Sequence, residues 1–76
     1  MAIDIDVQRL QLGDVILIDL PDQDTNIEAK VVRNPEVVRK IERSEGTVRA
    51  TLRVSGRDDF VMEWPWDHQV TLIRGP

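Results

Sequence analysis

Residues 47–54 alternate strictly between polar and apolar side chains. The even-numbered positions are apolar: Val48, Ala50, Leu52 and Val54. The odd-numbered positions are polar: Thr47, Arg49, Thr51 and Arg53. Because successive side chains of a strand point to opposite faces, a period of two indicates a strand with one buried face and one face in water.

Shorter apolar segments follow one another along the rest of the chain. They predict further strands at residues 15–20, 27–33, 36–43, 60–64 and 70–73. Residues 36–43 also fit a helical spacing, and we prefer a strand because residues 44–46 give a short hairpin connection into the next strand. Residues 1–11 leave two alternatives, a short edge strand and a disordered arm.

Turn residues separate these segments, so the pattern predicts an all-β fold. We expect a small antiparallel barrel of five to six strands, closed or partly open, since closure removes the exposed edges of a small sheet. One 3₁₀ turn is expected at residues 66–69, directly after Pro65 ends its strand. The predicted barrel domain covers residues 12–74, with residues 1–11 as an arm or edge strand and residues 75–76 as a tail.

Two short motifs give the chain an architectural resemblance to known proteins. Residues 12–16 read Leu-Gly-Asp-Val-Ile, and residues 64–67 read Trp-Pro-Trp-Asp before the apolar segment at 70–73. With the strand order between them, this pattern resembles the SH3-like small barrels of many bacterial proteins. Signalling SH3 domains bind proline-rich peptides in a groove lined by tyrosines, and this chain has no tyrosine. The resemblance therefore implies an architecture and no particular activity.

Length and composition narrow the class of protein. A chain of 76 residues makes one domain, and without cysteine it has no disulfide, thiolate or cysteine-based zinc site. No apolar run approaches the roughly 20 residues of a membrane span, and residues 1–6 lack the features of a signal peptide. We therefore expect a cytoplasmic protein that does not bind membranes.

Charge is distributed in blocks along the chain. The net charge is −4, yet residues 29–57 carry eight basic and three acidic residues, whereas the segments on either side are acidic. Arg49 and Arg53 share the polar face of their strand, and Arg39 and Arg43 fall on the segment before it. A hairpin of these two segments would present four arginines together. The alternative is an ordinary solvated strand face that also discourages edge pairing.

The three aromatic residues lie within seven positions of one another, namely Phe60, Trp64 and Trp66. Alternation places Phe60, Met62 and Trp64 on one face. We favour these side chains as filling for the barrel interior. The functional alternative leaves Trp66, and with it Trp64, half exposed as an anchor for a partner, because tryptophan is enriched in binding hot spots.

Nothing in the sequence indicates an enzyme. It has no glycine-rich phosphate loop and no nucleophile elbow, and the single histidine, His68, has no metal-binding spacing to its acidic neighbours. We therefore predict no catalytic residues, no cofactor and no metal.

The leading functional hypothesis is a non-enzymatic protein-binding or regulatory module. Its predicted binding residues are Arg39, Arg43, Arg49, Arg53, Trp64 and Trp66. The alternative is a nucleic-acid-binding barrel that uses the basic hairpin at residues 39–57, with arginines on phosphates and Trp66 stacked on a base. The acidic net charge disfavours this alternative. The sequence leaves the partner and the oligomeric state open.

Overall fold

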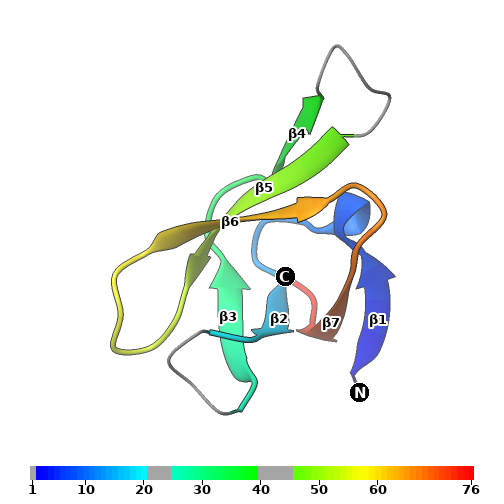
Figure 1. Ribbon diagram of the computed structural model, residues 1–76. Helices are drawn as coiled ribbons and strands as arrows, with labels where there is room; N and C mark the ends of the chain where they lie inside the picture. The colour runs from blue at the N-terminus through cyan, green and yellow to red at the C-terminus, as the bar shows by residue number, and fades with distance from the viewer. Residues whose placement is uncertain (1, 21–24, 40–45) are drawn as a thin grey trace.

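The computed structural model describes residues 2–20, 25–39 and 46–76, and over these residues the chain is an all-β half-barrel (Figure 1). Seven strands form one curled antiparallel sheet, accompanied by one 3₁₀ turn, η1. The elements are β1 (Ile3–Asp6), η1 (Val7–Arg9), β2 (Val15–Ile18), β3 (Ile27–Val31), β4 (Glu36–Arg39), β5 (Gly46–Arg53), β6 (Phe60–Pro65) and β7 (Gln69–Arg74). The predicted fold class, a small antiparallel all-β barrel-like fold, is confirmed. None of the described residues forms a helix long and apolar enough to cross a membrane.

Strand β5 organises one half of the sheet. It pairs with β6 along residues 47–52, and β4 and β3 follow one another along its other edge. Val31 of β3 is paired with Leu52 of β5, and Glu36 of β4 is paired with Arg49. From the first pair to the second, the chain moves five residues along β3 and β4 but only three along β5. Two extra residues are therefore accommodated where Asn34-Pro35 interrupts pairing, because proline donates no amide hydrogen bond.

The two ends of the chain meet in the other half of the sheet. Strand β7 lies between β1 and β2, with Ile3 opposite Leu72. Just after β1, the Val7 amide donates a 2.9 Å hydrogen bond to the His68 carbonyl. Among the described residues, β1, β4 and β6 each pair with one strand only. The β4–β5 hairpin extends away from the body of the sheet (Figure 1).

The hydrophobic core lies inside the curled sheet. Its least exposed large side chains are Val7, Ile16, Val31, Val48 and Leu52. The even-numbered positions of β5 are buried and its arginines are exposed, as the alternation predicts. Burial of these apolar side chains provides the main favourable free energy of folding.

The turn before β2 explains the Leu-Gly-Asp motif. Gly13 has a φ of +96°, a conformation that side chains with a Cβ rarely adopt. Its amide donates to the Val31 carbonyl, and the Val31 amide donates to the carbonyl of Asp14, which extends the β2–β3 pairing. The buried Asp14 carboxylate accepts a 2.9 Å hydrogen bond from the Gln11 amide. The motif is therefore a structural turn.

Two sequence predictions differ from the structure. The described residues form seven strands where five to six were expected, because residues 3–6, left open between an edge strand and a disordered arm, form β1. The 3₁₀ turn lies at Val7–Arg9, whereas the prediction of one at residues 66–69 was wrong. There the His68 amide bonds to the Pro65 carbonyl in a single tight turn, and Gln69 already belongs to β7. The end of the predicted strand at residues 40–43 lies outside the described residues.

Candidate interaction surface

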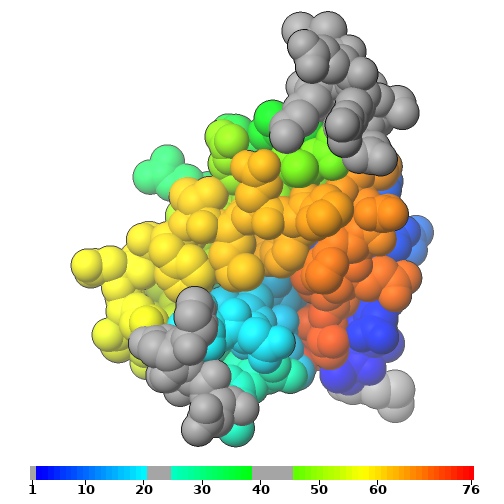
Figure 2. Space-filling model, viewed as in Figure 1, coloured from blue at the N-terminus to red at the C-terminus, as the bar shows by residue number. Residues whose placement is uncertain are grey.

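Strands β5 and β6 present a shared outer face with a regular arrangement of side chains. The register places Arg49 opposite Glu63 and Thr51 opposite Val61. Directly opposed residues of an antiparallel pair point to the same side of the sheet. We call this surface the β5–β6 outer face: Thr47, Arg49, Thr51 and Arg53 of β5, with Asp59 before β6 and Val61, Glu63 and Pro65 of β6. In Figure 2, the residues of β6 form a continuous yellow-to-orange band across the molecule.

Both arginines of this face are held by carboxylates. The Arg49 Nε donates a 3.1 Å hydrogen bond to Glu63 Oε1, while Thr47 Oγ1 donates to the other Glu63 oxygen at 2.8 Å. Arg53 makes a bidentate pair with Asp59, from Nε to Oδ1 at 2.8 Å and from Nη2 to Oδ2 at 3.0 Å. All four charged side chains remain between about one third and two thirds exposed to solvent. Pairs of this kind fix side-chain geometry more than they stabilise the fold.

The bidentate pair shifts the pKa of both partners. The hydrogen bond from Arg53 lowers the pKa of the Asp59 carboxyl, and the positive charges of Arg53 and Arg33 lower it further. The same hydrogen bond, with the negative charge of Asp59, raises the pKa of the Arg53 guanidinium. Both groups therefore stay ionised near neutral pH, so the face carries fixed charges of both signs.

The predicted cluster of four arginines is only partly described. Arg49 and Arg53 lie on one exposed face, as predicted, but Glu36 of β4 is the register neighbour of Arg49. Arg39 is paired with Gly46 at the far end of that ladder, and Arg43 lies outside the described residues. The described part of the hairpin is thus a face of mixed charge.

Val61 is the surface feature that the sequence reasoning did not identify. It is 57% exposed and lies between the two ion pairs, opposite Thr51. The signal was present in the sequence, since the alternation that turns Phe60, Met62 and Trp64 inward must turn Val61 outward. Its importance depends on its neighbours on β5, which only the register reveals.

The two tryptophans have different environments. Trp64 is only 7% exposed and belongs to the hydrophobic core, and Phe60 and Met62 pack against that core, as the preferred interpretation predicted. Trp66 is partly buried and packs against the core edge. Its amide donates to the Gly46 carbonyl, and its carbonyl accepts a bond from the Gln8 side chain. Of the two rings, only Trp66 retains surface that a partner could contact.

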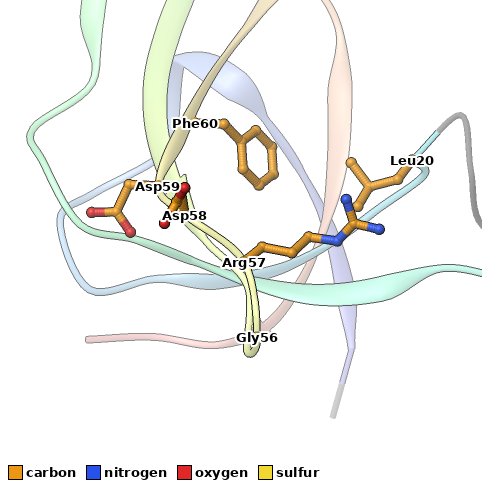
Figure 3. Close-up of a pocket in the computed structure, with 6 residues that line it drawn as sticks. All are labelled: Leu20, Gly56, Arg57, Asp58, Asp59 and Phe60. Carbon is orange, nitrogen blue, oxygen red and sulfur yellow. The ribbon is translucent and has the colours of Figure 1, made fainter.

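A shallow, open hollow of about 690 Å³ lies beside the turn between β5 and β6. Leu20 and Phe60 supply its apolar lining, and Gly56, Arg57, Asp58 and Asp59 supply the remainder. In Figure 3, the Arg57 side chain extends toward Leu20, whereas the Asp59 carboxylate points to the opposite side. The hollow therefore opens beside the β5–β6 outer face.

No group of three or more histidine, cysteine, aspartate or glutamate side chains that could hold a metal ion occurs among the described residues. His68 is exposed, and its backbone carbonyl and amide make the turn and strand contacts described above.

Comparison with known proteins gives no relative: no family model matches the chain, and no curated protein or solved structure is significantly similar to it.

Proposed function

We propose that this chain is a non-enzymatic protein-interaction module with the architecture of an SH3-like barrel, and that it works in the cytoplasm. Its binding surface is the β5–β6 outer face. The observation that supports this proposal is Val61, an apolar side chain that is 57% exposed at the centre of the β5–β6 pair.

The arrangement around Val61 matches the anatomy of a small protein interface. Energetically important contacts are apolar, central and surrounded by residues that exclude water. Here the Arg49–Glu63 pair lies on one side of Val61 and the Arg53–Asp59 pair on the other. The charged groups are positioned by hydrogen bonds before any partner arrives, which lowers the entropy lost on binding.

The nucleic-acid alternative has weaker support. Phosphate binding needs cations whose charge is available to the backbone of the nucleic acid. Arg49 and Arg53 both already contact carboxylates of β6 or its preceding turn. A phosphate would have to compete with these carboxylates, so we place protein binding first.

The proposal is tested by comparing two surface variants as bait. Purified wild-type protein, Val61→Lys and Leu12→Lys are each immobilised and exposed to a lysate of the cells that encode the chain. Leu12 is the matched control, because it is 47% exposed and lies in the turn before β2, outside the β5–β6 outer face. We expect specific partners to be retained by wild type and Leu12→Lys and lost with Val61→Lys.

Equal retention by all three proteins would contradict the proposed face. A parallel titration with mixed-sequence DNA and RNA oligonucleotides at low salt tests the alternative. Binding there that disappears with Arg49→Glu/Arg53→Glu would replace the protein-binding proposal by nucleic-acid binding.

A further inference from the structure

The charges of the β5–β6 outer face are segregated by strand. Both cations, Arg49 and Arg53, belong to β5, whereas both anions, Glu63 and Asp59, belong to β6 or its first preceding position. Thr51 lies between the two cations on β5, and Val61 lies opposite it between the two anions. The face therefore has a positive column and a negative column with a neutral centre.

Such a face is complementary to itself in one orientation. When two copies stack face to face about a two-fold axis parallel to the strands, β5 of one copy lies over β6 of the other. Each arginine column then faces a carboxylate column. A two-fold axis across the strands would instead place like charges over each other. In the first orientation, the contact is isologous and closes as a dimer.

We propose that a second copy of this chain binds the β5–β6 outer face in this strand-parallel two-fold arrangement. This inference rests on the proposed function, because it names the occupant of the same surface. The dimer places Val61 of each copy near Thr51 of the other, at the centre of a four-strand sandwich. Aligned sheets pack about 10 Å apart, a distance that arginine and glutamate side chains from both sides can span.

The position of β6 is compatible with this packing. It has a strand partner only on the β5 side among the described residues, so no described strand flanks the face beyond β6. Each charge keeps its partner within the chain and gains an opposite charge across the interface. Because these charges are solvated in the monomer, we expect weak association that is sensitive to salt.

The experiment uses complementary charge variants of the full chain. Arg49→Glu/Arg53→Glu makes the face wholly negative, and Asp59→Lys/Glu63→Lys makes it wholly positive. Sedimentation equilibrium at low salt is measured for wild type, for each variant alone and for their equimolar mixture, after circular dichroism has shown that each variant is folded. We expect wild type to dimerise, each variant to be monomeric, and the mixture to form a heterodimer about tenfold tighter than the wild-type dimer, because no internal ion pairs compete with the cross-interface pairs.

Val61→Lys provides a second test that leaves all four native charges in place. It should weaken the wild-type dimer at least about tenfold, since a charge at the centre opposes close packing, whereas Leu12→Lys should leave the dimer unchanged. A wild-type protein that stays monomeric at millimolar concentration and low salt would overturn the inference. So would a dimer unaffected by Val61→Lys, or charge variants that do not combine.

These results separate the inference from the proposed function. A monomeric wild type that still captures another protein through Val61 would remove the second copy and keep the binding face. Loss of both self-association and capture would remove the proposed function as well.

Discussion

Gly13 shows how one residue sets the geometry of a turn. Its φ of +96° suits glycine, and a Cβ placed there would lie 2.8 Å from the Pro76 Cβ. Gly56 also has a positive φ, +81°, but a Cβ there would meet nothing within 4 Å. Substitution at Gly56 therefore tests backbone strain alone, whereas substitution at Gly13 tests backbone strain together with a steric clash.

We expect Gly56→Ala to lower the free energy of unfolding by about 1–2 kcal/mol, the cost of a left-handed conformation. Gly13→Ala should cost clearly more, because it adds the clash with Pro76. Urea unfolding of both variants measures the difference. The double variant Gly13→Ala/Pro76→Gly should recover the excess; equal costs at the two glycines would show that the clash is relieved without penalty.

Asp59 adds a pH dependence to stability. Its pKa in the folded chain is lowered, chiefly by the hydrogen bond from Arg53. Such a group stabilises the fold at pH values above its unfolded pKa, about 4, and this contribution is lost as the pH falls through the lower folded pKa. The Arg53–Asp59 pair therefore favours the folded state at neutral pH.

The expected result is a stability difference between wild type and Asp59→Asn that is largest near pH 7 and disappears in acid. Urea midpoints measured from pH 7 to pH 2 test this expectation. The control is Asp58→Asn, a change at the neighbouring exposed residue. A difference that is constant over this range would mean that the pair does not bias folding.

Strand β5 shows at the scale of one element what alternation can predict. Its burial alternates residue by residue, with Leu52 fully buried and Arg49 and Arg53 exposed, as predicted from periodicity alone. The partners of those arginines could not be predicted in the same way. Whether Arg49 faces Glu63 depends on the register between strands joined by a turn, and a shift of one residue would exchange the faces.

Substitutions on the two faces of β5 should therefore differ sharply. Leu52→Ala should cost about 2–5 kcal/mol through lost burial and a cavity, and Leu52→Asp should unfold the chain because a carboxylate would be buried without a partner. Arg49→Glu should leave a folded protein of lower stability, since it places a third acidic group beside Glu36 and Glu63. Circular dichroism distinguishes these outcomes; an unfolded Arg49→Glu with a folded Leu52→Asp would reverse the face assignment.

At the scale of the whole molecule, the fold class could be predicted, but the long-range strand pairing that joins the two ends of the chain could not. Short strands between turn residues sufficed for an all-β, barrel-like fold. The sequence left residues 1–11 open between strand and disorder, because the pairing that orders β1 comes from β7, more than sixty residues away. The misplaced 3₁₀ turn has the same origin: a few polar residues near Trp66 are compatible with several turns, and long-range pairing selects one.

The N-terminal segment should thus contribute to global stability through its buried side chains and little through its exposed ones. Val7 is fully buried in the core, whereas Ile3 of β1 is 52% exposed. We expect Val7→Ala to cost about 2 kcal/mol, from the loss of two buried carbon groups, and Ile3→Ala to be nearly neutral. Thermal unfolding measures both. Equal small effects would show that residues 3–9 do not fold cooperatively with the rest.

The position of β7 between β1 and β2 also has a consequence for biosynthesis. Strands β1 and β2 are translated before the strand that joins them, which is made only after β3, β4, β5 and β6. At ~5–20 residues per second, the edges of β1 and β2 that pair with β7 remain unpaired for several seconds. This half of the sheet therefore cannot form until β7 has been made, and the nascent chain is most exposed to chaperones and to edge-to-edge aggregation just before β7 emerges.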